Sequence, residues 1–395
     1  MLALWILVVP MALVGGFQPS PATSVHPPAL WMRPSLPVMS TPELKLMNTS
    51  SSRHRHSSSL GASTTPTAIS TSSKENTSKP SFPVVLWRFT RPHTIIGSAL
   101  AIPALHMLAA PTYAAAFTTR SLCSMLYAMV PALLMNLYIT GLNQVTDVEI
   151  DKINKPDLPI AAGDLSMKNG IITILVAVIL SLSMGFAHPV FGTQGLNVAL
   201  WVSGILGTLY SLEPFRLKRF PFLAAFCIVS VRGAVINAGF FAHARAAAFG
   251  ASGSVMECLT SDPRCILSSL YFAVFGIVIA LMKDVPDVKG DAISNVRTFS
   301  VRLGQKRVFG GMHRLLTALF VGVGASFLRS AFLTSSSLVI QVGRGVVGLS
   351  AVLAGLSVQK EAKPVDPDDS KQVYNFYMHL WKLFYLSYLV LPLAR

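Results

Sequence analysis

Carboxylate side chains are gathered in two short stretches of this sequence. The spacing is i, i+4, i+8 in the first stretch and i, i+3, i+7 in the second, so each predicts side chains on one face of a helix. Oxygen ligands of this kind suit Mg²⁺, which binds a few carboxylates and completes its octahedron with water and substrate phosphate. The candidate ligands are Asn143, Asp147, Asp151, Asp284, Asp287 and Asp291.

Basic residues lie close to both stretches. Cations beside paired carboxylates indicate a polyanion that is bridged to the protein through metal, and a diphosphate offers oxygens to the metal and to the cations. A single cluster would more simply be a solvated helix end, but two clusters favour a metal site. The candidates for substrate contact are Arg91, Lys152, Lys155, Arg216, Lys218 and Lys283. Any of them could instead be an ordinary loop residue, and for Lys152 the two interpretations are equally good.

The elements that position these residues are predicted to be membrane helices. Of the 395 residues, 52% are hydrophobic and only 12% are charged, against roughly 25% charged residues in an ordinary soluble domain. The mean hydropathy is +0.55. The net charge of +15 does not indicate nucleic-acid binding, because the basic residues lie in short loops between apolar runs. Most of the surface is therefore expected to face the lipid bilayer.

Nine apolar runs of roughly membrane-spanning length follow residue 81. They predict an all-α, polytopic membrane protein with a nine-helix transmembrane bundle. The runs cover residues 93–112, 121–142, 169–188, 196–213, 220–243, 264–283, 308–328, 335–358 and 374–393.

The loops between these runs carry charge unequally. Assigned to alternate sides, they place 17 basic residues on one side and five on the other, as the positive-inside rule requires. Both carboxylate stretches fall on the positive side, at helix ends. An ion-coupled carrier, the rival membrane function, would place carboxylates near the midplane and broken helices in matched repeats. The sequence shows neither pattern.

Residues 1–80 differ in composition from the rest of the chain. A short apolar run, Met1 to Gly16, has the length of a signal-peptide core, and the stretch after it is basic, poor in acid and rich in Pro, Ser and Thr. This composition predicts a disordered targeting presequence. It resembles the bipartite presequences that lead into plastids of red-algal origin, and a secretory signal before a linker is the alternative. Residues 81–395 are the predicted transmembrane domain.

Two further features leave alternatives open. Cys258 and Cys265 share one loop and could form a disulfide on an oxidising side or remain free thiols. Arg232 lies in the middle of the fifth apolar run, where a charge is costly and marks either a functional group or a buried pair.

Three stretches resemble the UbiA-type intramembrane prenyltransferases. Residues 141–166, GLNQVTDVEIDKINKPDLPIAAGDLS, carry an NxxxDxxxD motif, residues 283–291, KDVPDVKGD, carry a second aspartate motif, and residues 86–94, LWRFTRPHT, match the usual start of the first helix. The resemblance runs from about Leu86 to Leu393. It implies a bundle around a central substrate cavity, with two Mg²⁺ ions held by the six candidate ligands and a lipid-facing opening for an isoprenoid.

Within this family the sequence is most similar to the plastid homogentisate prenyltransferases, and among these to the branch with a solanesyl donor. The similarity rests on residues 154–166, 207–221 and 231–247. It implies transfer of a long prenyl chain from solanesyl diphosphate to homogentisate with decarboxylation, giving a plastoquinone precursor in a plastid membrane. Phytyl transfer, on the route to tocopherol, is the first alternative, and chlorophyll synthesis is a more distant one.

The resemblance also implies roles for individual residues. Asp147, Asp151, Asp287 and Asp291 would be catalytic through the metals. Tyr210 would stabilise an allylic cation with its electron-rich ring, although aromatic residues at helical spacing more commonly only pack. Apart from the resemblance, the costly charge of Arg232 within the fifth apolar run could bind the homogentisate carboxylate, with an interhelical structural pair as the alternative.

Overall fold

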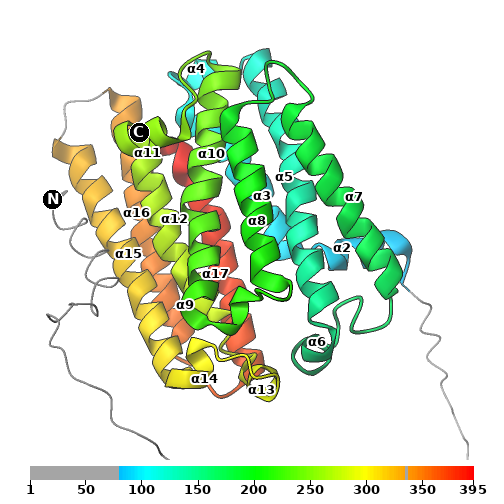
Figure 1. The fold of residues 1–395 in the computed structure, drawn as a ribbon. Coiled ribbons are helices and arrows are strands. Elements are labelled where there is room, and N and C mark those ends of the chain that lie inside the picture. The colour runs from blue at the N-terminus through cyan, green and yellow to red at the C-terminus, as the bar shows by residue number, and fades with distance from the viewer. Residues whose placement is uncertain (1–79, 334–336) are drawn as a thin grey trace, which may run out of the picture. The chain divides into compact units, whose positions relative to one another are not determined.

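The computed structural model describes residues 80–333 and 337–395, and within them it contains helices and loops but no β-strand (Figure 1). The all-α prediction is confirmed for this part of the chain. The predicted presequence, apart from Pro80, lies outside the described residues and remains a prediction.

Long helices form the bundle. They are α3 (Pro92–Ala109), α5 (Thr119–Thr146), α7 (Met167–Phe186), α8 (Gln194–Ser211), α12 (Pro263–Met282), α15 (Gln305–Leu333), α16 (Leu338–Ala362) and α17 (Ser370–Val390). A further continuous rod consists of α9 (Pro221–Val229), the π-helical turn η2 (Ser230–Val235), α10 (Ile236–His243) and the π-helical turn η3 (Ala244–Ala248).

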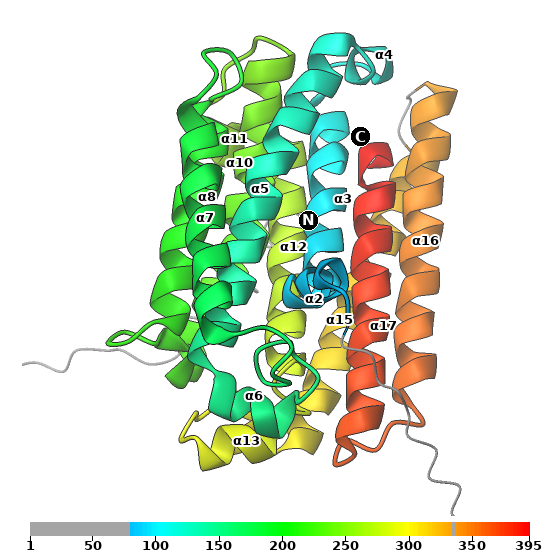
Figure 2. The same ribbon diagram turned by 90° about the vertical axis from the view of Figure 1, so that its right-hand side faces the viewer.

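Short helices connect these elements. They are α2 (Phe82–Phe89), α4 (Tyr113–Ala116), α6 (Val148–Asn154), η1 (Leu217–Arg219), α11 (Val255–Ser261), α13 (Val288–Ile293), α14 (Phe299–Leu303) and η4 (Leu391–Leu393). Both views show α6 and α13 at one end of the bundle and α4 and α11 at the other (Figure 1 and Figure 2).

Seven of the described helices are long and apolar enough to cross a membrane. They are α3, α5, α7, the rod over Pro221–Ala248, α12, α15 and α16. The other two predicted spans correspond to α8 and α17, which are helical but fall outside this set. The helical membrane bundle is thus established, whereas a nine-span topology remains a prediction.

Glycines let neighbouring helices approach closely. A Cβ on Gly195 of α8 would lie 2.5 Å from the carbonyl oxygen of Gly239 in α10. A Cβ on Gly324 of α15 would lie 2.9 Å from the carbonyl oxygen of Gly348 in α16. Small residues at such contacts are a usual means of packing helices in lipid, where no hydrophobic force drives helices together.

Arg264 stabilises the end of the bundle that carries α4 and α11. Arg264 donates to the carbonyl oxygen of Leu108 at 3.0 Å, at the C-terminus of α3, and pairs with Asp262 at 2.9 Å. Cys258 and Cys265, near this end, are buried and free, so the disulfide alternative is not realised. The opposite end holds the two aspartate stretches.

Candidate active site

A cavity of about 850 Å³, called the central cavity below, is lined by most of the residues that the sequence singled out. The two aspartate stretches, far apart in the sequence, meet along its wall. The candidate residues that line it are Asn143, Asp147, Asp151, Asp284, Asp287 and Asp291, the cations Arg91, Lys155, Lys218, Lys283 and Arg232, and Tyr210.

Neither aspartate stretch lies on a continuous helix, so the prediction of a single helical face for each is wrong. α5 ends at Thr146, Asp147 has φ −115° and ψ 18°, and α6 begins a new helix. α12 ends at Met282 and α13 begins at Val288, with Pro286 between them. Proline lacks the N–H that a helix interior needs. The side chains nevertheless share the central cavity, because both breaks lie beside it.

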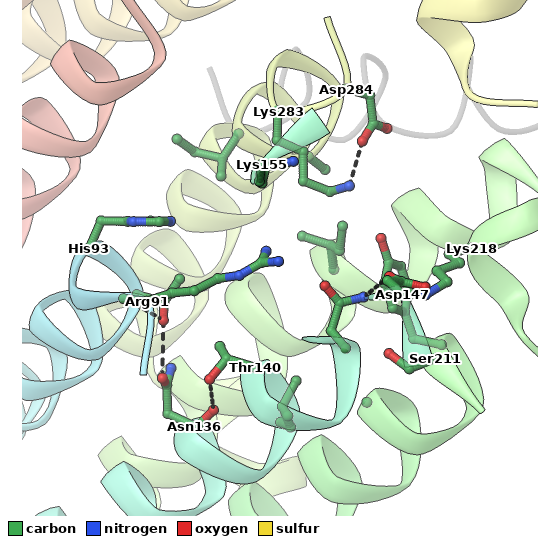
Figure 3. Close-up of a pocket in the computed structure, with 18 of the residues that line it drawn as sticks. Arg91, His93, Asn136, Thr140, Asp147, Lys155, Ser211, Lys218, Lys283 and Asp284 are labelled. Carbon is green, nitrogen blue, oxygen red and sulfur yellow. Dashed lines mark hydrogen bonds and ion pairs between the residues drawn. The ribbon is translucent and has the colours of Figure 1, made fainter. Parts of the chain in front are cut away.

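Four of the five candidate aspartates pair with basic side chains. The pairs are Asp147 with Lys218 and with Arg216, Asp151 with Arg91 at 3.8 Å, Asp284 with Lys283, and Asp287 with Lys155. Figure 3 shows Arg91 and His93 on one side of the pocket, and Asp147 with Lys218 on the opposite side. The carboxylates are thus balanced by cations of the protein itself.

Two arginines of the site have backbone conformations that L-residues rarely adopt. Arg91 has φ 50° and Arg216 has φ 37°. Such residues are uncommon outside glycine and cluster at functional sites, where the surrounding structure holds them. Arg91 reaches Asp151, and Arg216 reaches Asp147 at 3.1 Å. The strained turns therefore deliver a guanidinium group to each carboxylate of the first stretch.

Asn154 joins the two aspartate stretches. Its amide nitrogen donates to Asp291 at 3.4 Å, and its amide oxygen accepts from the backbone N–H of Gly290 at 3.1 Å. A Cβ on Gly290 would lie only 2.3 Å from that oxygen, so the contact requires glycine there. Asn154 was not among the residues predicted from the sequence, although an amide three residues after Asp151 was a signal for it.

Burial sets the electrostatics of the site. It raises the pKa of Asp151 to about 6 and that of Asp291 to about 7. It also lowers the pKa of Lys218 to about 8, against the opposing effect of Asp147. Burial penalises the charged form of each group. An additional cation would stabilise the two carboxylates in their charged form, and an additional anion would stabilise the lysine.

The donor set of the site fits magnesium. Among the described residues, no three His, Cys, Asp or Glu side chains are arranged closely enough to hold a metal ion, because the carboxylates turn to lysine and arginine instead. However, the donors are all oxygens, as Mg²⁺ prefers. Asp151 Oδ2 and Ser211 Oγ are buried in the cavity wall and form no hydrogen bond with described residues. A divalent ion bound at Asp151 would give its Oδ2 the partner that this atom lacks.

Two candidate cations are not part of the cavity lining. Lys152 is exposed and pairs with Glu149 at 2.8 Å, on the outer face of α6. Arg216 approaches Asp147 from outside the lining and also pairs with Glu213 at 3.2 Å. The structure therefore places Lys152 away from the other candidates, and gives Arg216 contact with a motif carboxylate.

Away from the aspartates the cavity wall becomes apolar. Ala132, Leu200 and Phe240 line it deep in the bundle. Asn143 and Ala132 are three helical turns apart on α5, which corresponds to roughly 16 Å along the helix axis. Tyr210 follows Leu200 along α8 and also lines the cavity, with its ring centroid 6.0 Å from the ammonium nitrogen of Lys283. The cavity therefore offers a charged region and an apolar extension, which suits an amphiphile with an anionic head.

The comparisons with known proteins agree with this geometry. The model of the UbiA prenyltransferase family matches residues 100–383, which is most of the chain. The chain belongs to this family. Homogentisate phytyltransferase 1 of Arabidopsis thaliana, a chloroplastic protein, is 38% identical over 337 residues, covering 84% of this chain and 80% of that protein. A homogentisate geranylgeranyltransferase of Hordeum vulgare is 36% identical, covering 78% of this chain and 72% of its own.

Solved structures confirm the fold of this UbiA prenyltransferase family member. A UbiA homologue of Archaeoglobus fulgidus, solved with DMAPP and Mg²⁺, superposes with a TM-score of 0.51 at 15% identity. The match covers 78% of this chain and 98% of the archaeal one.

The structure also contains a polar stripe that was not predicted from the sequence. Thr94 and Ser98 of α3, and Asn136 and Thr140 of α5, line the central cavity. Thr94 donates to Asn136 at 3.1 Å, and Asn136 donates to Ser98 at 3.2 Å. The signal was an i, i+4 spacing of polar residues within two apolar runs. In this prenyltransferase the stripe gives the cavity wall hydrogen-bonding groups beside the aspartates.

Proposed function

We propose that this chain is a Mg²⁺-dependent prenyltransferase that joins the prenyl group of a prenyl diphosphate to homogentisate. The observation that carries the proposal is the meeting of two aspartate motifs and their counter-cations at one end of an apolar cavity. The relatives in Arabidopsis and barley are named as homogentisate prenyltransferases, which supports the acceptor.

The diphosphate would bind at the charged end of the central cavity. The residues that would hold two magnesium ions are Asn143, Asp147, Asp151, Asp284, Asp287 and Asp291. When bound, the ions supply positive charge to the leaving diphosphate. Arg91, Lys155, Lys218 and Lys283 would turn from their carboxylate partners to the phosphate oxygens. Arg216 would keep its ion pair with Asp147. Lys152, which is exposed on α6 and pairs with Glu149, would not contact the diphosphate directly.

The prenyl chain would lie in the apolar extension. Breaking the allylic carbon–oxygen bond leaves positive charge on the prenyl group, and preorganised groups stabilise such charge best when they face it. The ring of Tyr210 lies beside Lys283 at the boundary between the two regions, where the reacting carbon would be. We assign Tyr210 this electrostatic role.

The acceptor ring would then attack the prenyl carbon. A ring carbon of homogentisate forms the new carbon–carbon bond and loses its proton, while the carboxymethyl group releases CO₂ and takes up a proton to become methyl. The product is a prenylated methylhydroquinone. Products of this class precede tocopherol when the chain is phytyl and plastoquinone when it is solanesyl.

The prenyl donor is proposed from the named relatives. The named relatives use phytyl or geranylgeranyl groups, and they support such a donor at least as well as the solanesyl donor predicted from the sequence. We therefore place phytyl and geranylgeranyl diphosphate first and retain solanesyl as a prediction. A plastid membrane is the proposed location, supported by the chloroplastic relative and by the apolar helices.

A transfer assay tests the proposal. Membranes that contain the full chain receive radiolabelled homogentisate and Mg²⁺, with phytyl, geranylgeranyl or solanesyl diphosphate offered separately. We expect labelled lipid product with one donor preferred, and loss of product with EDTA or with Asp147→Ala. Glu149→Gln, a change of an exposed carboxylate outside the cavity, is the matched control. Absence of transfer to homogentisate from every donor would refute the proposal.

A further inference from the structure

Arg232 occupies a π-helical turn in the wall of the central cavity. The turn, η2, interrupts the rod between α9 and α10. Gly233 lets this turn lie against α12, since a Cβ there would be 2.6 Å from the Cβ of Ala273. π-Helical turns of this kind are rare in proteins, and those that occur are often found at functional sites.

Hydrogen bonds hold the turn in place. The amide nitrogen of Asn237 donates to the carbonyl oxygens of Arg232 at 2.6 Å and of Gly233 at 2.8 Å. The hydroxyl of Tyr388 in α17 donates to the amide oxygen of Asn237 at 3.3 Å. Carbonyl groups that a π-helical turn exposes in an apolar bundle need such partners. The position of Arg232 is therefore built into the fold.

The guanidinium group of Arg232 differs from the other cations of the cavity. Arg91, Lys155, Lys218 and Lys283 each pair with an aspartate. Among the described residues, Arg232 has no ion pair and no side-chain hydrogen bond, so the interhelical pair considered from the sequence is not formed there. An unpaired charge within a membrane bundle is costly. A ligand anion would remove that cost.

Aromatic rings form the surroundings of this cation. The Arg232 guanidinium carbon lies 4.8 Å from the ring centroid of Trp381 and 5.8 Å from that of Phe384. His93 stands edge-on to Trp381, with ring centroids 5.1 Å apart, and Tyr377 is 6.3 Å from His93. His93, Tyr377 and Trp381 line the cavity with Arg232. Flat walls beside one cation suit a flat ring that carries one negative group.

We propose that Arg232 binds the carboxylate of the aromatic acceptor, and that His93, Tyr377 and Trp381 form the walls around the acceptor ring. This inference rests on the proposed function and specifies where its second substrate binds. The diphosphate is a poorer occupant, because η2 carries no carboxylate that could share a metal ion with it. The subsite thus separates the monoanionic acceptor from the diphosphate, which has its own cations at the motifs.

Binding measurements on the purified full chain test the assignment. Radiolabelled homogentisate is titrated without donor onto the wild type, Arg232→Met and Arg232→Lys, and geranylgeranyl diphosphate with Mg²⁺ is titrated separately. A hydrogen bond to a charged group contributes to the free energy of binding. We therefore expect Arg232→Met to weaken homogentisate binding roughly tenfold or more. Arg232→Lys should restore part of this loss. Methylhydroquinone has the ring without the carboxylate. Its affinity, measured by competition with homogentisate, should be no higher for the wild type than for Arg232→Met.

The matched control is Arg329→Met, which removes an exposed arginine from α15 outside the cavity. The inference is supported if Arg232→Met loses affinity for homogentisate but binds geranylgeranyl diphosphate as tightly as the wild type does. Equal homogentisate affinity in the wild type and Arg232→Met overturns it, as does parallel loss of both ligands. Prenyl transfer by the wild type is measured on the same samples. If the wild type transfers the prenyl group and Arg232→Met keeps its homogentisate affinity, the inference about Arg232 is refuted. The proposed function is then unaffected.

Discussion

The ammonium group of Lys155 contacts the carboxylate of Asp287, and this contact links the segment after the first aspartate motif to the second motif. Lys155 follows α6 directly, and Asp287 precedes α13. Both residues line the central cavity. One ion pair therefore holds together the two loops that, under the proposed function, would bind the same diphosphate, and it occupies a carboxylate that a metal ion would need.

Replacement of Lys155 by Met should separate these two effects. We expect the KM for the prenyl diphosphate to rise about tenfold, because a charge-assisted contact to phosphate is lost. The Mg²⁺ concentration for half-maximal rate should fall, because Asp287 no longer has a competing partner. Transfer rates over a grid of donor and Mg²⁺ concentrations measure both. Lys168→Met, at an exposed lysine outside the cavity, should leave both unchanged. A higher Mg²⁺ requirement in Lys155→Met would contradict this account.

Gly290→Ala should disturb the link between the motifs. The added methyl would occupy the position of the Asn154 amide, so Asn154 must leave Gly290 and Asp291. We expect kcat to fall about tenfold or more, since small displacements of positioned groups are costly in rate. The double variant Gly290→Ala with Asn154→Gly should recover part of the loss, because the steric conflict is gone.

The control for this pair is Gly311→Ala in α15, where a Cβ meets nothing within 4 Å. It should keep full activity. Strictly additive losses in the Gly290 and Asn154 double variant would show that the two residues do not act through their mutual contact.

Ala132→Phe should shorten the apolar extension of the cavity. Ala132 lines it on α5, and a phenyl ring there would fill space that the end of a prenyl chain would use. We expect the ratio of kcat/KM for geranyl diphosphate to that for geranylgeranyl diphosphate to rise about tenfold, because overpacking excludes the longer chain first. Val130→Phe, on the exposed face of the same helix, should keep the wild-type ratio. An unchanged ratio in Ala132→Phe would place the chain elsewhere.

Ligand-induced stabilisation should require metal and diphosphate together. A ligand at about a hundredfold excess over its Kd stabilises the folded state by about 2.7 kcal/mol. We expect Mg²⁺ with inorganic pyrophosphate to raise the Tm of the detergent-solubilised chain by several degrees, and either alone to raise it much less. Asp291→Asn should abolish the joint effect. A full Tm shift with pyrophosphate and EDTA would argue against a metal-bridged site.

Most of the bundle was predictable from hydropathy, since every predicted apolar run coincides with a helix in the described residues. A run of that length has few alternatives in lipid, where the backbone must bond within itself. The same criterion cannot decide whether α8 and α17 span the membrane. Both helices carry polar and aromatic residues among their apolar ones, and α17 packs Trp381 and Tyr388 inside the protein.

The candidate site was predictable as a set of residues and less so as a geometry. Aspartate spacing identified the ligands, but it did not reveal the helix breaks at Asp147 and Pro286. Sequence proximity to Asp151 also drew in Lys152, which points outward to Glu149. Tertiary contacts between distant segments decided these positions. Asn154 and the π-helical turn at Arg232 depend on partners that no local pattern identifies.

The carboxylate–lysine pairs of the charged end have a consequence for how the site is loaded. Asp147 and Asp287 are already neutralised by Lys218 and Lys155, so an incoming ion would have to replace an existing ion-pair partner. A lone Mg²⁺ would have to strand a buried ammonium group, and a lone diphosphate would strand a buried carboxylate, each at a large desolvation cost. A magnesium diphosphate would exchange both partners at once and would leave the total charge of the cluster nearly unchanged. Under the proposed function, such a site would stay closed to free metal and would admit metal only together with substrate.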